Sequence, residues 1–402
     1  MPDFRPFPAL RYASNTDLDA VLAPPYDVLT SDDVRRLHDR DPYNITHVDV
    51  PDDYDHAAET LWQWIGEGVL RSDETDTFTI YRMKFADATG TDRTIVGVLG
   101  GLAVLDPPTG ADRVPGATTV LPHERTTPKA ATDRLELMRA TAANTSPVWG
   151  LSLASGLTDA LREPGEPLGT VEVDGVTHSV ERVSEPSRIA AIRAVLAADD
   201  VLIADGHHRY AVSRIYRDEV RSATGRADTL AEHTLTFVNE LVDDQLSISA
   251  IHRLYAGVTT AELRAALAES FELTPAPPAT PALLAEMVKS GRLVALWPDG
   301  SAEWLAPRPG VFEHARALDG VWLETALAGT PVGVTYEHDL GEISKRVVSG
   351  DLAGAVLIRP TSIEEIRRTA REGLLMPPKS TFFTPKLLTG WVLRPTQALM
   401  TA

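Results

Sequence analysis

The stretch 201–210, Val-Leu-Ile-Ala-Asp-Gly-His-His-Arg-Tyr, constrains the fold of this chain more than any other. Its four leading apolar residues predict a short buried strand, and Asp205-Gly206 is a turn signal. Residues 207–223 then have the apolar spacing of a helix. The expected apolar face comprises Tyr210, Val212, Ile215 and Tyr216, and the expected solvent face comprises Arg214, Arg217, Asp218 and Glu219. The sequence therefore predicts a strand, a tight turn and a helix.

The first turn of this predicted helix is suited to bind phosphate. The first four N–H groups of a helix lack partners within the helix, and the helix dipole is positive at that end. Arg209 can donate two parallel hydrogen bonds to a phosphate. His207 and His208 can transfer protons near neutral pH. In the alternative interpretation, Asp205 caps the helix and both histidines are ordinary surface residues.

Composition limits the classes of protein to which the chain can belong. Its 402 residues predict two or three domains, and its 43% hydrophobic and 24% charged content is typical of a globular protein. The net charge of −19 disfavours non-specific binding to nucleic acid or to membrane surfaces. The absence of cysteine excludes disulfides, thiol catalysis and zinc–thiolate sites. No apolar stretch approaches the roughly 20 residues of a membrane span. We expect a cytoplasmic protein, and the sequence does not predict its oligomeric state.

The apolar patterns predict a mixed fold, α/β in the first part and α+β in the second. Residues 77–85 and 93–105 predict two strands joined by a turn, and a helix is expected from Gly225 to about Leu235. The expected parts are a catalytic domain over residues 1–255 with a peripheral insertion at about 155–185, an α+β domain over 256–372, and a C-terminal arm over 373–402 that returns to the core.

Two resemblances follow from short motifs. Asp205-Gly-His-His-Arg209 resembles the signature of the ParB/sulfiredoxin superfamily, which includes sulfiredoxins, CTP-binding ParB domains and archaeal kinases of free serine. The whole chain resembles the bacterial and archaeal family called domain of unknown function 1015. The stretches that carry this second resemblance are Pro24–Val28, His123–Thr126, Asp133–Leu135, Asn144–Pro147, Asp205–Tyr210, Met376–Thr381 and Pro385-Lys386.

The superfamily resemblance implies a nucleotide-binding core of ParB/sulfiredoxin type, in which a glycine-rich turn and a helix start ending in arginine hold nucleotide phosphates. Cysteine-dependent sulfiredoxin chemistry cannot use a thiol of this chain, because it has none. By resemblance to the serine kinases, the phosphate acceptor would be a small hydroxylated metabolite, and free serine is the first acceptor to test.

Residues suited to phosphoryl transfer occur in most of the motif stretches. The chain has arginines and lysines for phosphate, carboxylates for Mg²⁺, and histidine or glutamate for proton transfer. We assign catalytic roles to His123, Glu124, Asp205 and His207. Phosphate or nucleotide binding is assigned to Gly206, His208, Arg209, Arg125, Lys129, Arg134, Lys379, Ser380 and Lys386. Tyr26, Asn144 and Tyr210 are assigned to substrate contact or to structure, and Asp27 and Asp133 to metal binding.

The predicted activity is a nucleotide-dependent phosphotransferase that uses ATP or ADP with Mg²⁺. The sequence contains no Walker motif and no kinase glycine-rich loop. Two alternatives remain open: a metal-dependent phosphohydrolase with ligands among His123, His207 and His208 together with Glu124 or Asp205, and a non-enzymatic nucleotide-binding regulator. We further expect His123 and Glu124 to approach the 205–210 turn. We also expect residues 376–386 to pack on the first half of the chain, bringing Lys379 and Lys386 near Arg209.

Overall fold

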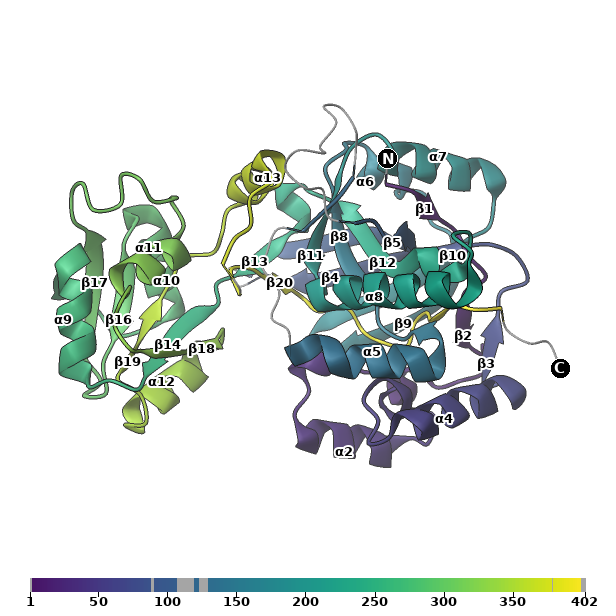
Figure 1. Cartoon of the computed structure of the whole chain (residues 1–402), viewed down its shortest axis with the longest axis horizontal. Helices are drawn as coiled ribbons and strands as arrows, with labels where there is room; N and C mark the ends of the chain where they lie inside the picture. Colours follow the sequence, from purple (N-terminus) through teal and green to yellow (C-terminus); the bar gives the residue numbers. More distant parts are fainter. Residues whose placement is uncertain (1, 88–89, 107–118, 123–128, 378, 399–402) are drawn as a thin grey trace. The chain divides into compact units, whose positions relative to one another are not determined.

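The computed structural model describes residues 2–87, 90–106, 119–122, 129–377 and 379–398, with the backbone alone for 129–131. The chain forms two compact units, and the expected fold class, a mixture of helices and sheets, is confirmed (Figure 1). The first unit consists of Met1–Leu246, Thr369–Leu374 and Pro385–Ala402, and the second of Ser247–Arg368 and Leu375–Thr384. None of the helices in the described ranges combines the length and apolar content needed to cross a membrane.

The first unit is built on a sheet of nine strands, counted within the described part of the chain, in the order β6-β11-β8-β12-β5-β4-β10-β9 with β1 paired to β5. The strands are β1 (Phe4–Arg5), β4 (Phe78–Ala86), β5 (Asp92–Ala103), β6 (Val120–Pro122), β8 (Val148–Ser152), β9 (Glu166–Val173), β10 (Val176–Val183), β11 (Val201–Asp205) and β12 (His233–Glu240). The predicted hairpin of β4 and β5 is confirmed by an antiparallel register from Thr79 opposite Leu99 to Ala86 opposite Asp92.

The two faces of this sheet are covered by different parts of the chain, because side chains alternate between faces along each strand. Phe78 and Ile80 of β4 pack with residues of α6 (Leu157–Ala160) and α7 (Pro186–Leu196). Tyr81, on the opposite face, contacts Phe237 of β12 and Trp391 near the C-terminus. The C-terminal segment is therefore part of the packing of the first unit.

The remaining elements of the first unit include the helix predicted after residue 206. This helix, α8 (His207–Thr224), packs beside α5 (Lys129–Thr141) through Val212, Tyr216, Leu135 and Met138 (Figure 1). The other elements are α1 (Leu18–Val21), η1 (Tyr26–Val28), α2 (Ser31–Arg40), α3 (Thr46–Asp49), α4 (Tyr54–Gly66), η2 (Leu230–Glu232), η3 (Asp243–Gln245), and the paired strands β2 (Leu10–Tyr12) with β3 (Leu70–Ser72) and β7 (Ala143–Asn144) with β21 (Arg394–Pro395).

Three predictions about this unit are wrong. Ile215, expected on the apolar face of the helix after residue 206, is 39% exposed. The helix expected from Gly225 to about Leu235 does not form: Gly225 ends α8 in a left-handed conformation, and β12 begins at His233 because its apolar residues pair with β5 and β8. Arg217, expected in solvent, is buried because its guanidinium donates to the carbonyl of Val104 and to Asp106. The expectation that 155–185 is a peripheral insertion stays a prediction, and the segment contains β9 and β10 at the edge of the main sheet.

The second unit has a sheet of six strands, within the residues described, in the order β15-β17-β16-β19-β14-β18. On one face α9 and α11 pack, and on the other α10 and α12 pack. The elements are β13 (Ser247–Ser249), β14 (His252–Ala256), α9 (Thr260–Ser270), β15 (Phe271–Pro275), α10 (Pro281–Ser290), β16 (Leu293–Leu296), β17 (Ala302–Pro307), α11 (Asp319–Ala326), β18 (Gly333–Glu337), α12 (Leu340–Val348), β19 (Gly354–Leu357) and β20 (Phe382–Thr384). The boundary between the units falls inside α13 (Ile363–Glu372) and again before Pro385.

The expected C-terminal arm is thus divided between the units. Residues 375–384 belong to the second unit, where β20 pairs with β13. Residues from 385 onward belong to the first unit. There Leu393 is fully buried, and its N–H and C=O groups pair with Leu10.

We predict that Leu393→Ala lowers the free energy of unfolding of the first unit by about 2–5 kcal/mol, as expected when a buried leucine leaves a cavity. The control is Ile215→Ala, which truncates a side chain of α8 that is 39% exposed. It should cost less than about 1 kcal/mol. Chemical denaturation of both variants measures the difference, and equal effects would show that the C-terminal segment contributes nothing to the core.

Candidate functional site: the turn between β11 and α8

The turn between β11 and α8 is made by a glycine that directly precedes the first turn of α8. Residues 201–204 are buried in the sheet, and Gly206 follows Asp205 with φ of 81°. The N-cap residue of α8 is Gly206, which has no side chain with which to cap the helix. A Cβ atom at Gly206 would lie 2.8 Å from Nε of Arg209, so glycine is required both by the backbone and by the space that the guanidinium occupies.

Asp205 is held between two cations. Its Oδ2 atom accepts from Nη2 of Arg209 at 2.8 Å, and its Oδ1 atom accepts from Nζ of Lys386 at 3.2 Å. Burial opposes ionisation of this carboxyl, but the charges of Lys386 and Arg209, the hydrogen bond from Lys386 and the nearby His207 hold its pKa well below the ordinary value. Asp205 is therefore a carboxylate at neutral pH and does not donate a proton.

Arg209 is buried, and each of its two terminal nitrogens donates to a group within the chain. Nη1 donates to the carbonyl of Pro147 and Nη2 to Asp205, whereas Nε has no hydrogen-bond partner in the described part of the chain. Burial acts to lower the pKa of Arg209, but the charge of Asp205, with smaller effects of Tyr26 and Asp27, raises it. The guanidinium therefore keeps its charge. Its two terminal nitrogens, expected to hold a phosphate, already have partners.

Tyr26 lies between two arginines. Its ring centroid is 4.2 Å from Cζ of Arg134 and 5.8 Å from Cζ of Arg209, which are cation–π distances. Arg134 donates through Nη1 to the carbonyl of Asp49 at 2.7 Å and through Nε to Asp133 at 2.7 Å. Burial raises the pKa of Tyr26, with the two arginine charges opposing it. Tyr26 is thus neutral and helps to screen two positive charges.

Two of the predicted substrate or structural residues have structural contacts. The amide oxygen of Asn144 accepts from the N–H of Leu235 at 3.0 Å. The hydroxyl of Tyr210 accepts from the N–H of Leu105 and donates to the carbonyl of Ala103, each at 2.9 Å. Burial raises the pKa of Tyr210 to about 12. These hydrogen bonds connect the segments of Asn144 and Tyr210 to the backbones of β12 and of the end of β5.

The structure adds two residues that the sequence reasoning missed. Asp49 is buried and accepts from the hydroxyl of Thr145 at 2.6 Å as well as from Arg134. Thr145 lies in the Asn144–Pro147 motif stretch, which was a usable signal. Asp49 stands between two valines and follows no recognisable pattern, so the sequence offered no signal for it.

Other predicted site residues belong to the second unit or lie outside the described residues. His123, Glu124 and Arg125 lie outside the described residues, as does the side chain of Lys129. Lys379 and Ser380 belong to the second unit, where the hydroxyl of Ser380 donates to the carbonyl of Pro377 at 2.7 Å. His207 and His208 lie in the first turn of α8, as the sequence predicts.

The two predicted metal ligands do not form a metal-binding cluster. Asp27 is exposed in η1, and Asp133 is exposed on α5, where it accepts from the hydroxyl of Tyr54 at 2.7 Å. Across the described ranges, no group of three or more His, Asp or Glu side chains gathers in a way that could hold a metal ion. Mg²⁺ in nucleotide sites commonly uses one or two carboxylates plus phosphate oxygens, and single carboxylates such as these are compatible with that arrangement.

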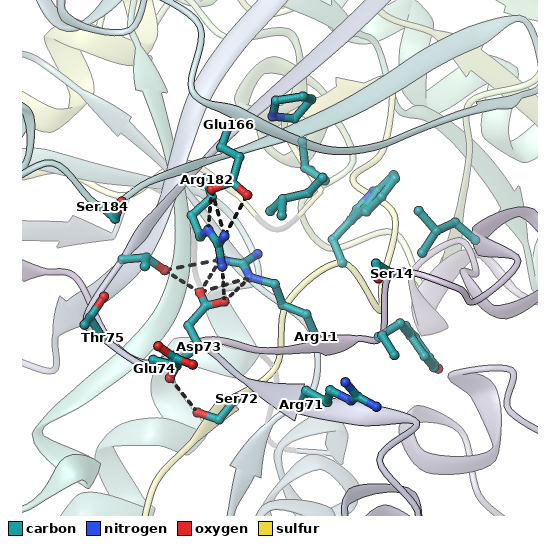
Figure 2. Close-up of a pocket in the computed structure, with 18 of the residues that line it drawn as sticks. Arg11, Ser14, Arg71, Ser72, Asp73, Glu74, Thr75, Glu166, Arg182 and Ser184 are labelled. Atoms are coloured by element: carbon teal, nitrogen blue, oxygen red, sulfur yellow. Dashed lines mark hydrogen bonds and ion pairs between the residues drawn. The ribbon is translucent and has the colours of Figure 1, made fainter.

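Two cavities of the first unit lie against buried arginines. A cavity of about 20 Å³ lies against Arg134, Asn144, Thr145 and Arg209, enough for about one water molecule. A second cavity of about 690 Å³ is lined by Arg11, Asp73, Glu166 and Arg182 among others (Figure 2). No motif marks this second cavity in the sequence.

Comparison with known proteins gives a family but no activity. The model of the family described as "Protein of unknown function (DUF1015)" matches residues 4–321. No curated protein matches the chain significantly. Among solved structures, a conserved hypothetical protein from Pyrococcus furiosus has 13% identity and a TM-score of 0.37, covering 66% of this chain and 87% of its own.

Two further solved structures are equally distant. A free serine kinase in complex with AMP has 14% identity and a TM-score of 0.39, covering 69% of this chain and 88% of its own. SbnI with a C-terminal truncation, from Staphylococcus aureus, has 15% identity and a TM-score of 0.37, covering 68% and 83%. These similarities are low in both measures, and nothing about the activity of this chain follows from them.

We predict that Asp205→Asn lowers the free energy of unfolding by roughly 3 kcal/mol near neutral pH, because it leaves two cations beside a neutral side chain. The pKa of Asp205 is depressed in the folded protein, so its stabilising effect is complete above the unfolded value of about 3.9 and is lost as pH falls below it. The difference between parent and variant should therefore shrink below about pH 4.

Chemical denaturation at about pH 7 and about pH 3.5 measures this dependence. Asp159→Asn serves as the control, because Asp159 pairs with Arg162 and its side chain is 71% exposed. A difference for Asp205→Asn that is the same at both pH values would contradict the ion-pair interpretation.

Proposed function

The chain belongs to the DUF1015 family, and we propose that it is a nucleotide-dependent phosphotransferase that acts on a small hydroxylated metabolite. The observation that carries this proposal is the start of α8, where a glycine is the N-cap residue and Lys386 and Arg209 both pair with the preceding Asp205. Phosphate oxygens are the acceptors that such a helix start favours.

The local charge supports a phosphate ligand although the chain as a whole is acidic. Asp205 contributes one negative charge, and Arg209 and Lys386 contribute two positive charges, so the three together carry one positive charge. The partial positive charge of the helix N-terminus adds to it. The nucleotide phosphates would bind the N–H groups of residues 207–209 with Lys386 beside them, while Arg209 acts mainly through its charge.

The proton chemistry falls to the histidines. The ion pairs with Lys386 and Arg209 keep the carboxyl of Asp205 ionised, so this side chain orients the two cations and does not exchange protons. His207 or His208 is positioned in the same turn to accept the proton of an acceptor hydroxyl, which is a common role of histidine. His123 and Glu124 remain proposed partners in this step, and Arg125 and Lys129 in phosphate binding.

The proposed donor is ATP or ADP bound with Mg²⁺, and free serine is the first acceptor to test. Asp27 and Asp133 are the proposed carboxylates for the metal. The proposed ParB/sulfiredoxin relationship rests on the Asp205–Arg209 motif. The protein is proposed to act in the cytoplasm, on a small molecule rather than on nucleic acid or membrane.

We predict that ATP or ADP with Mg²⁺ raises the melting temperature of the protein. A nucleotide at 100 times its dissociation constant should stabilise the folded state by about 2.7 kcal/mol. His207→Ala and Lys386→Gln should each reduce this stabilisation by at least half, since each removes a group beside the phosphates. His56→Ala is the matched control, because His56 is exposed on α4. Equal stabilisation of all four proteins would remove the turn from the nucleotide site.

We predict that the protein converts serine to phosphoserine when it is supplied with nucleotide and Mg²⁺, and that His207→Ala slows this conversion by about 100-fold or more, the usual contribution of a general base. The measurement is phosphoserine and inorganic phosphate by ³¹P NMR. Release of inorganic phosphate without phosphoserine would favour the phosphohydrolase. Nucleotide binding without turnover of serine or of other hydroxylated metabolites would favour the regulator.

A further inference from the structure

The cavity of about 690 Å³ in the first unit has the size of a small-molecule site, for which about 300–1,000 Å³ is usual (Figure 2). Its walls come from five segments distant in sequence, and they combine three kinds of side chain. The hydroxyl groups are those of Ser14, Ser72, Thr75, Thr77 and Ser184, the apolar wall includes Tyr12, Leu18, Leu168 and Trp391, and the charged groups are Arg11, Arg71, Asp73, Glu74, Glu166 and Arg182.

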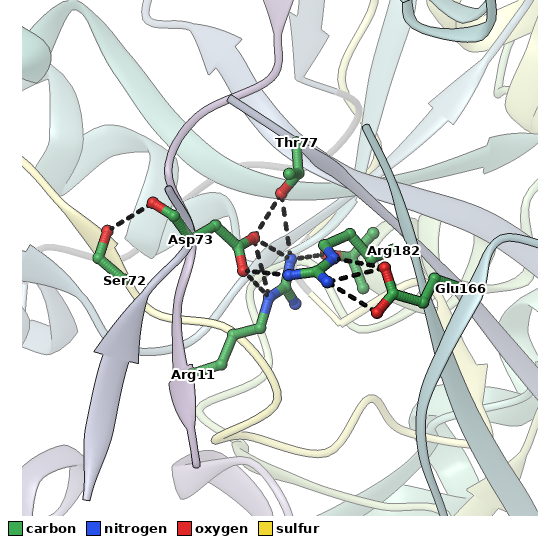
Figure 3. Close-up of polar contacts among 7 residues, drawn as sticks. Arg11, Ser72, Asp73, Thr77, Glu166 and Arg182 are labelled. Carbon is green, nitrogen blue, oxygen red and sulfur yellow. Dashed lines mark hydrogen bonds and ion pairs between the residues drawn. The ribbon is translucent and has the colours of Figure 1, made fainter. Parts of the chain in front are cut away.

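Asp73 is the centre of the charged part of the cavity (Figure 3). Its side chain is buried and accepts from Nε and Nη2 of Arg11, both at 3.1 Å, and from the hydroxyl of Thr77 at 2.6 Å. Nη1 of Arg182 lies 3.4 Å from its other oxygen. Asp73 therefore has all the donors that a carboxylate needs, and it holds both arginines in place.

Arg11 retains one donor group for a ligand. The residue is 8% exposed, and Nη2 donates to Asp73 and to the hydroxyl of Thr79 at 2.6 Å. Its Nη1 atom is buried and has no hydrogen-bond partner among the described residues. Leaving a buried donor of a charged group without an acceptor is unfavourable. An acceptor atom in the adjoining cavity would remove that cost.

Arg182 forms an ion pair with Glu166, whose side chain is exposed enough for a ligand to displace it. Its Nη2 and Nε atoms donate to Glu166 at 2.7 and 3.0 Å, in the fork geometry that guanidinium forms with a carboxylate or phosphate. The side chain of Glu166 is 57% exposed, whereas that of Asp73 is 7% exposed. An exposed ion pair contributes little, so Glu166 can turn into solvent at small cost.

The charges then favour an anionic ligand. The three arginines and three carboxylates that line the cavity balance while Glu166 is in place, and without Glu166 three positive charges face two negative ones. We propose that this cavity is a second small-molecule site, which binds the carboxylate or phosphate group of a hydroxylated metabolite through Arg182 and Nη1 of Arg11 after that group displaces Glu166. The hydroxyl-lined wall would bind the rest of the ligand. The site does not depend on the proposed phosphotransfer.

Isothermal titration calorimetry with malate and, separately, with inorganic phosphate tests the site. Arg182→Gln should weaken binding about tenfold or more, because it removes a charge-assisted fork. Glu166→Gln should tighten binding about two- to fivefold, because it removes the competing carboxylate. The matched control is Arg162→Gln, which removes an exposed arginine that pairs with Asp159 and does not line the cavity. Glycerol, which has hydroxyls but no oxyanion, should not bind.

The opposite effects of the two substitutions distinguish this site from the turn before α8. Malate binding with a larger affinity than phosphate would identify carboxylate metabolites as the ligands, and the reverse would identify phosphorylated ones. Circular dichroism melting confirms that each variant is folded. Binding of neither anion by the parent and by Glu166→Gln would overturn the proposal. The proposal is also overturned if Arg182→Gln and Glu166→Gln bind the anion with the same affinity as the control Arg162→Gln.

Discussion

The carboxylate of Asp205 is the interaction on which the turn site depends. It joins Arg209, one helical turn away, to Lys386, which is 181 residues distant in sequence. Without this carboxylate, a buried guanidinium and a half-buried ammonium would repel each other. The same contact fixes the C-terminal segment near α8, and further along this segment Trp391 lines the larger cavity and Leu393 completes the packing around Leu10. Residues beyond the family match of 4–321 therefore contribute to both sites.

Local signals in the sequence were sufficient for much of the fold. The strand, turn and helix over 201–224 follow from an apolar run, an Asp-Gly pair and helical spacing, and the β4–β5 hairpin follows from alternation around a glycine turn. The helix expected after Gly225 does not form. The strand β12 begins at His233 instead, because it pairs with β5 on one side and with β8 on the other and is buried on both faces. Of the residues expected to be helical, 230–232 form η2, and 233–235 already belong to the strand.

The candidate sites could be predicted only where a motif marks them. The turn at residue 206 and Lys386 were visible in the sequence, but their ion pair required the fold. The burial of Arg209 was not predictable, since an arginine in a first turn is usually exposed. Arg11, Asp73 and Arg182 carry no motif, because an ion pair across a sheet sets no spacing along the chain. Charged clusters of this kind become visible only when their segments are placed together.

The central claim is that an anion binds the N–H groups at the start of α8. The most direct test is NMR of protein labelled with ¹⁵N at its 11 histidines, titrated with ADP. The amide signals of His207 and His208, assigned through His207→Gln and His208→Gln, should shift and saturate with added ADP, while those of His56 and His252 stay in place. If ADP leaves the signals of both His207 and His208 unchanged at every concentration, the start of α8 does not bind the nucleotide.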